Sequence, residues 1–177
     1  MELNGIKINQ KTEFTRRCIG EAVIKLLQSN SFEQLKISEI SKVAGVSRTS
    51  FYQYYTSPYE VLNDYLNIIV SEYLLADKKL NDDDNYFATP HIIFSFNFFD
   101  KYSQFFLTLY KSKLYSVLIE AVNDFMIKHI KLEQNISVYK LYAYAGALLN
   151  SFLKWEENGK KEKVEDIAIA LENFVYK

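Results

Sequence analysis

The sequence predicts an all-α fold, with a small head of three helices at the N-terminus and a larger helical body after it. Apolar residues recur every three or four positions along most of the chain, which is the spacing of one helix face. The 177 residues include only 2 Pro and 5 Gly, so few breaks interrupt the helices. Hydrophobic residues make up 49% of the chain, which is enough for a substantial core.

The first predicted helix spans residues 12–28, after a polar stretch, 1–10, that is expected to be loose. Phe14, Cys18 and Ala22 begin its apolar stripe, so it is expected to pack across the next two helices and brace them. Cys18 is the only cysteine, which excludes an internal disulfide, and its place on the stripe predicts a buried structural thiol.

Two short helices with a tight turn between them are predicted over residues 37–55. Residues 37–44 carry one apolar stripe, and Gly45 is a natural stop because glycine readily adopts the left-handed backbone. Ser47 is placed to cap the second helix, residues 48–55, by accepting a bond from a free N–H. Such a pair is either an ordinary corner of a helical protein or a helix-turn-helix that enters a DNA groove.

The exposed side chains of the second helix favour DNA. They carry donors and acceptors near a helix N-terminus, and Arg48 adds a cation, as contacts to base edges and phosphates require. Residues at the start of the preceding helix are expected to contact the DNA backbone. The predicted DNA-binding residues are Lys36, Ser38, Ser47, Arg48, Thr49, Ser50, Tyr52 and Tyr54.

The segment AGVSRTSFYQYY, residues 44–55, resembles the signature of the TetR/AcrR family of transcriptional regulators, A-G-V-S-x-x-x-x-Y-x-[HY]-F. The rest of the chain resembles the family in length and helical texture. The resemblance implies a TetR-like fold, with a helix-turn-helix DNA-binding domain at residues 1–57 and a helical ligand-binding and dimerisation domain at residues 58–177.

The chain departs from the family pattern at three places. Many members have Thr where Lys36 precedes the first motif helix, so that cap is lost or moved. Thr56 and Pro58 occupy the region where many members have a Lys that bonds the DNA backbone, which puts one phosphate contact in doubt. Tyr54 and Tyr55 replace the commoner His–Phe pair; Tyr54 can still donate to a phosphate, and Tyr55 can still fill the core.

The body is predicted to begin with a long helix that runs to about residue 79. Ser57 is its N-cap, Pro58 takes the first helical position, and Glu60 completes a capping box. Further helices are predicted in the aromatic segment 90–110, with a break near 100–103, and over 113–130, 137–155 and 164–176. Residues 82–84, three adjacent aspartates, are predicted to be a solvated loop.

The resemblance implies that the last two long helices form a two-fold dimer interface. The alternative is that their apolar surplus only fills the core of one protomer. The implied interface residues are Tyr142, Leu149, Phe152, Trp155, Ile167, Leu171 and Val175.

The resemblance also implies a ligand pocket between the long helix and those after it, although most aromatic residues of the body are expected to be plain core. The candidates by type and placement are Tyr73, Phe99, Tyr102, Tyr110, Tyr115, Asn123 and Tyr142.

No catalytic pattern, cofactor motif or metal site is found. His91 and His129 have no Cys or carboxylate at metal-ligand spacing, so the chain is not expected to be an enzyme. The net charge of −1 excludes a strongly basic protein, although residues 1–60 carry 8 Lys and Arg against 6 Asp and Glu. The longest apolar run, residues 141–149, is far below the roughly 20 residues of a membrane span, so a soluble cytoplasmic protein is expected.

The expected function is that of a dimeric, sequence-specific DNA-binding transcriptional regulator, a repressor that a small-molecule ligand releases from a palindromic operator. The segment FLKWEENGKK, residues 152–161, and residues 59–62 resemble one branch of the family, that of the co-activator of a dihydroxyacetone kinase operon. The alternative is therefore a TetR-like co-activator, or an interaction protein regulated by a protein partner.

Overall fold

The computed structural model describes residues 2–3, 6–7, 10–78, 85–130 and 136–176, so the predicted loop at 82–84 lies outside the described residues. The chain divides into two compact units, Met1–Glu72 and Tyr73–Lys177. The predicted boundary, between residues 57 and 58, precedes the long helix, whereas the structure divides within that helix.

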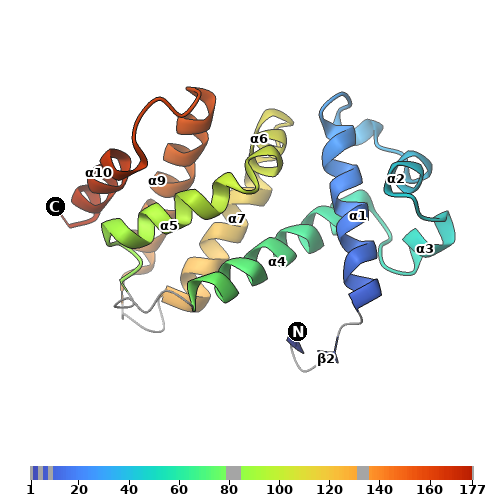
Figure 1. Cartoon of the computed structure of the whole chain (residues 1–177), viewed down its shortest axis with the longest axis horizontal. Coiled ribbons are helices and arrows are strands. Elements are labelled where there is room, and N and C mark those ends of the chain that lie inside the picture. The colour runs from blue at the N-terminus through green and yellow to red at the C-terminus, as the bar shows by residue number, and fades with distance from the viewer. Residues whose placement is uncertain (1, 4–5, 8–9, 79–84, 131–135, 177) are drawn as a thin grey trace. The chain divides into compact units, whose positions relative to one another are not determined.

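The first unit, called the head below, contains a bundle of short helices (Figure 1). Two short strands stand before it and pair antiparallel, in the region that the sequence predicts to be loose. The elements in order are β1 Glu2–Leu3, β2 Ile6–Lys7, α1 Gln10–Leu27, the 3₁₀ helix η1 Phe32–Gln34, α2 Ile37–Ala44, α3 Arg48–Tyr52 and α4 Pro58–Asp77, whose first part belongs to the head.

The core of the head lies between α1, α2 and α3. Ile19, Val23, Ile40 and Phe51 are each 0% exposed. The prediction that Phe14 belongs to the buried stripe is wrong, because its side chain is 69% exposed. Periodicity gives the phase of an apolar stripe but does not say which turns of the helix are covered by other elements.

The first part of α4 packs closely on α1. A Cβ atom at Gly20 would lie 2.6 Å from the ring of Tyr65, so only glycine allows this approach. Arg17 forms an ion pair with Glu72 and a second one with Glu13. These contacts explain why residues up to 72 belong to the head, although they lie on the same helix as the start of the body.

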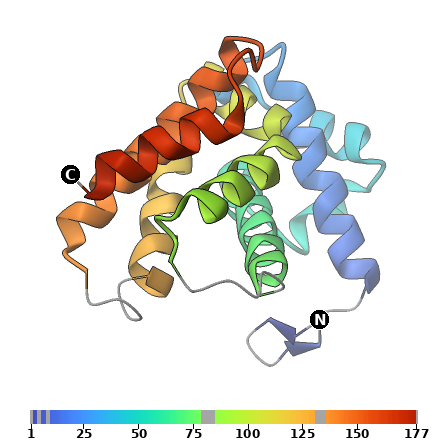
Figure 2. The ribbon, with the colours of Figure 1, turned by 60° about the vertical axis from the view of Figure 1, so that its left-hand side comes forward.

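The described part of the body consists mainly of helices (Figures 1 and 2). The predicted break near residues 100–103 is confirmed, and the helix predicted over 113–130 changes to a π-helical turn before it ends. The elements are α5 Thr89–Asp100, α6 Ser103–Lys111, α7 Tyr115–Phe125, the π-helix η2 Met126–Ile130, α9 Val138–Glu157 and α10 Val164–Tyr176.

Aromatic rings fill the core of the body. Phe152 is 0% exposed, and its ring centroid lies 5.8 Å from that of Phe96 and 5.4 Å from those of Phe99 and Phe106. Helix α10 packs on both α5 and α9, and Figure 2 shows it running alongside α9. None of the helices in the described residues is long and apolar enough to cross a membrane.

Candidate nucleic-acid interface

The turn between α2 and α3 has a backbone that requires glycine. Gly45 has φ 69° and ψ 28°, the left-handed region, and no atom lies within 4 Å of a Cβ built on it. The amide of Val46 then donates to the carbonyl of Ser41 at 3.0 Å. The turn is therefore closed by backbone bonds, and a side chain at position 45 would add conformational strain without filling a space.

Ser47 caps α3 as predicted. Its Oγ accepts a hydrogen bond from the amide of Ser50 at 2.9 Å, and the two hydroxyl oxygens also lie 2.9 Å apart. These hydroxyls are therefore already bonded to one another, so the helix start is fixed before any ligand arrives. Their neighbours Arg48 and Thr49 are exposed.

The outer face of α3 is polar and exposed above an apolar anchor. Tyr52 is 52% exposed, whereas Phe51 beneath it is fully buried, with the two rings at 5.8 Å in an edge-to-face arrangement. Arg48 forms no ion pair with any residue that the structure describes. A cation and a phenol hydroxyl therefore point to solvent from a fixed helix, as contacts to phosphates and base edges need. Tyr54 is half-buried beside Tyr55, after the end of α3.

The helix α3 is shorter than predicted. It ends at Tyr52, and Gln53 and Tyr54 form a turn, instead of continuing to residue 55. The amides of Tyr54 and Tyr55 both donate to the carbonyl of Phe51 at 3.0 Å, which closes the helix early.

The start of α2 presents two further predicted residues. Lys36 is the N-cap residue, with an extended backbone and no capping bond from its side chain, as the loss of the usual Thr implies. Its carbonyl accepts from the amide of Glu39 at 2.9 Å, and its own side chain is exposed. Ser38, in the first turn, is also exposed.

The start of α4 carries a negative charge where many TetR-like chains carry a lysine. Thr56 donates to Glu60 through its amide at 2.7 Å and its hydroxyl at 2.6 Å. Both bonds lower the pKa of Glu60, and the bond from the hydroxyl has the larger effect, so the carboxylate stays ionised. The predicted capping box is thus shifted, because Glu60 bonds Thr56 while its amide donates to Ser57 at 3.3 Å. This carboxylate argues against a phosphate contact there.

The structure places the predicted pocket residues in different surroundings. Tyr73 is buried among the rings of Phe94, Phe98 and Phe125, at centroid distances of 5.3, 5.2 and 5.1 Å. Phe99, Tyr102 and Asn123 are half-buried, Tyr115 donates to Asn150 at 3.0 Å, and Tyr110 and Tyr142 are exposed. A surface hollow of about 380 Å³ lies elsewhere, lined by Asn150, Ser151, Lys154, Trp155, Asn158, Glu162 and Ile167.

The predicted dimer residues fall into two groups. Leu149, Phe152, Trp155 and Leu171 are at most 7% exposed, so these four belong to the core of the protomer, which corrects their assignment. Tyr142, Ile167 and Val175 remain at least partly exposed and are available to a partner. Sequence reasoning missed four exposed large hydrophobic side chains of α9 and α10, which are Tyr139, Ile169, Phe174 and Tyr176.

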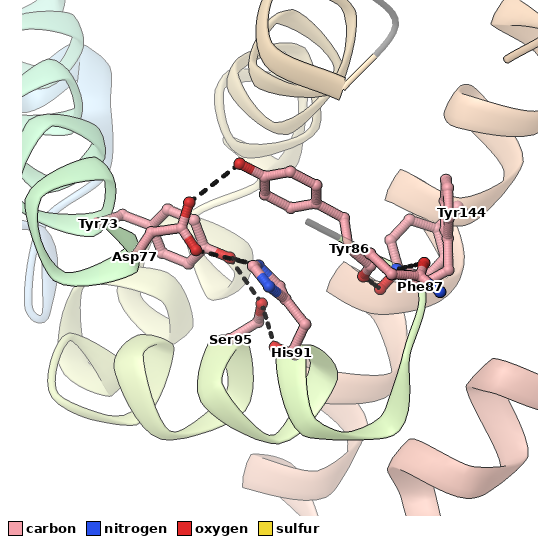
Figure 3. Close-up of polar contacts among 8 residues, drawn as sticks. Tyr73, Asp77, Tyr86, Phe87, His91, Ser95 and Tyr144 are labelled. Atoms are coloured by element: carbon pink, nitrogen blue, oxygen red, sulfur yellow. Dashed lines mark hydrogen bonds and ion pairs between the residues drawn. The ribbon is translucent and has the colours of Figure 1, made fainter. Parts of the chain in front are cut away.

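A polar cluster of the body was also missed (Figure 3). The hydroxyl of Tyr73 lies 2.8 Å from Ser95 Oγ and 3.0 Å from His91 Nε2, and Tyr86 donates to Asp77 at 3.0 Å. Ser95 donates its own proton to the carbonyl of His91 at 3.0 Å, so Tyr73 donates to Ser95 and accepts from Nε2–H of His91.

The members of this cluster bond one another. His91 Nε2 also lies 3.5 Å from Asp77 Oδ1. Burial raises the pKa of Tyr73, so its hydroxyl stays protonated and continues to donate. Nowhere in the described ranges do three or more His, Cys, Asp or Glu side chains meet in a way that could hold a metal ion. A signal for the cluster does exist in the sequence, since His91 and Ser95 are one helical turn apart.

No family model matches the chain. A segment of 126 residues is 27% identical to the HTH-type dhaKLM operon transcriptional activator DhaS of Lactococcus lactis subsp. lactis, and covers 63% of this chain. The match spans about 64% of the length of that relative.

Solved structures resemble nearly the whole chain. A protein of Listeria innocua superposes with a TM-score of 0.78 at 15% identity, covering 98% of this chain and 93% of its own. A TetR-family transcriptional regulator from Streptomyces coelicolor has a TM-score of 0.60 at 16% identity, covering 90% of this chain and 80% of its own. These findings show that the chain is all-helical and has the fold of TetR-family transcriptional regulators, and that part of its sequence is similar to that of DhaS.

Proposed function

We propose that the chain is a transcriptional regulator that binds DNA through α2 and α3 in a sequence-specific manner. The observation that carries the proposal is the face of α3, where Arg48, Thr49 and Tyr52 are exposed on a helix whose start is held by Ser47. Buried Phe51 holds the same helix from the other side. A polar, cationic surface on a fixed short helix is what base readout in a major groove needs.

The proposal includes a homodimer that reads a palindromic operator. It is supported by exposed apolar side chains on the last two helices, Tyr142 and Ile169 among them, at 49% and 50% exposure. A two-fold dimer would present two copies of α3 to half-sites one helical turn apart. Light scattering of the purified chain tests this, and a monomer at the concentrations that bind DNA would contradict it.

The experiment that tests DNA binding is a selection of genomic fragments by the purified protein, followed by titration of the selected site over a salt series. Arg48→Ala should weaken operator binding by about 1–3 kcal/mol if Arg48 contacts a base. Lys161→Ala is the matched control, because it removes one exposed cation from the body. The control should bind like the wild type, and equal binding by the Arg48 variant would refute its role.

Two modes of regulation follow from this proposal. Repression relieved by a small-molecule ligand is the mode expected from the family resemblance. Activation, alone or with a protein partner, is favoured by the match to DhaS, which is named as an activator. A reporter placed behind the selected operator separates them, since deleting the regulator raises expression in the first case and lowers it in the second.

A further inference from the structure

Three side chains from three segments of the head meet at one carboxylate. Asp64 of α4 accepts a hydrogen bond from the Tyr55 hydroxyl at 2.5 Å on Oδ2. Arg16 of α1 donates to the same oxygen through Nε at 2.8 Å and to Oδ1 through its terminal nitrogen. The guanidinium therefore donates two hydrogen bonds to the carboxylate, and the phenol donates a third. These three residues are called the Asp64 anchor below.

The Asp64 anchor is shielded enough for its bonds to persist in water. Tyr55 is 5% exposed, and the side chains of Arg16 and Asp64 are each 20% exposed. Burial first, and then the bond to Asp64, raise the pKa of Tyr55, so its hydroxyl is a donor at neutral pH. The bond to Asp64 likewise raises the pKa of Arg16. Arg16 and Tyr55 therefore both keep the protons that their bonds to Asp64 require.

Tyr55 links the Asp64 anchor directly to α3. Its amide donates to the carbonyl of Phe51 at 3.0 Å, and its ring centroid lies 5.7 Å from that of Phe51. The helix α3 has five residues, too few to hold itself in place through its own backbone bonds. Its orientation therefore depends on its two ends, where Ser47 fixes the start and Tyr55 fixes the exit.

The hydroxyl of Tyr55 is a departure from the family signature, which commonly has Phe at this position. A phenylalanine ring would fill the same core space but has no hydroxyl to donate to Asp64. Because the hydroxyl finds a carboxylate that is itself held by Arg16, the exit of α3 is tied to both α1 and α4 by polar bonds with directional geometry.

We infer that Asp64 is a positioning residue for DNA recognition: through Tyr55 it sets the orientation of the exposed face of α3. This inference rests on the proposed function. Asp64 itself touches no DNA in this account, because its carboxylate is occupied by Arg16 and Tyr55.

The test compares Asp64→Asn and Tyr55→Phe with Glu72→Gln. Glu72 lies on the same helix, about two turns beyond Asp64, and its ion pair with Arg17 also joins α4 to α1. Each variant is titrated with the selected operator and with unrelated DNA, and its thermal midpoint is recorded. Loss of positioning should weaken operator binding by about tenfold, the size of one imperfect base contact, and leave binding to unrelated DNA unchanged.

The control and a double variant separate positioning from a merely structural role, and the results expected from positioning are the following. Glu72→Gln should keep operator affinity within about twofold even where its thermal midpoint falls as far as that of Asp64→Asn. The double variant of Asp64 and Tyr55 should lose no more operator affinity than the weaker-binding single variant, because both changes remove the same bond between Tyr55 and Asp64. Operator affinities that follow the thermal midpoints in all variants, or that stay at the wild-type value, would overturn the inference.

Hydrogen exchange of the free protein separates this inference from the proposed function. In Asp64→Asn the α3 amides that the helix protects, including that of Phe51, should exchange about tenfold faster than in the wild type and in Glu72→Gln. Unchanged exchange would overturn the anchoring of α3, whatever the DNA binding. Faster exchange together with no specific DNA binding by the wild type would overturn the proposed function and leave the anchoring intact.

Discussion

The outer face of α3 and the polar cluster of the body use the same kinds of side chain in opposite ways. On α3, Arg48 and Tyr52 face solvent, and Arg48 has no ion-pair partner in the described ranges. In the body, Tyr73 is 7% exposed, and its hydroxyl bonds both Ser95 and His91. The hydrogen-bonding groups on the outer face of α3 are available to a ligand, whereas those of the polar cluster already bond one another in the folded protein.

This difference teaches that residue type alone does not mark a functional site in a chain rich in tyrosine. Burying an unpaired hydroxyl is costly, so the body can hold tyrosines only where partners are built in. Tyr144, for example, donates to the carbonyl of Tyr86 at 2.8 Å (Figure 3).

Alkaline pH is expected to have the largest effect. Burial raises the pKa of Tyr55, Tyr73 and Tyr144, so each binds its proton more tightly in the folded than in the unfolded state. Their stabilisation is complete below the unfolded value of about 10 and is lost as the pH rises toward the folded values.

Titration of phenolate absorbance beside circular dichroism measures this. The phenol groups of Tyr55, Tyr73 and Tyr144 should ionise only together with the loss of helicity. Complete ionisation of all tyrosines with helicity intact would show that the body is not closed around them.

Truncation of Phe152 tests the aromatic core. Phe152→Ala should lower the free energy of unfolding by about 3–5 kcal/mol, because the ring is fully buried among Phe96, Phe99 and Phe106. Phe14→Ala is the matched control in the head, where the ring is 69% exposed, and should cost less than about 0.5 kcal/mol. Urea unfolding measures both, and similar losses would contradict the assignment of Phe14 to the surface.

Two helical glycines give a second matched pair. Gly20→Ala should lower the free energy of unfolding by about 1–3 kcal/mol, because the added Cβ would meet the Tyr65 ring at 2.6 Å. Gly146→Ala on α9 adds the same methyl group where no atom lies within 4 Å, so it should be neutral or stabilise by up to about 1 kcal/mol. Thermal midpoints give the signs, and a stabilising change at Gly20 would refute the close packing of α1 on α4.

The cap of α3 is expected to have the smallest effect. Ser47→Ala removes the oxygen that accepts from the Ser50 amide and should cost about 1 kcal/mol in unfolding free energy. Thr49 lies in the first turn of α3 and is exposed, so Thr49→Ala should change the free energy of unfolding by less than about 0.5 kcal/mol. If the two variants have equal stability, the cap does not hold the helix start and the fixed presentation of Arg48 is lost.

Features that depend only on neighbouring residues could be predicted from the sequence. Gly45 stops α2 because few other residues adopt its backbone angles, and Ser47 starts α3 because its hydroxyl reaches an amide three residues away. The break between α5 and α6 and the bounds of α10 were predicted for the same reason. The all-helical class follows from the spacing of apolar residues, which is visible within each short stretch of sequence.

Tertiary structure decided what depends on segments far apart in the chain. An apolar stripe does not say what covers it, so exposed Phe14 and buried Phe152 could not be placed. The anchoring of α3 through Tyr55 depends on Asp64, a residue 48 positions from its partner Arg16. Local spacing carries no information about such pairs, because their distance is set only when α1 and α4 pack together.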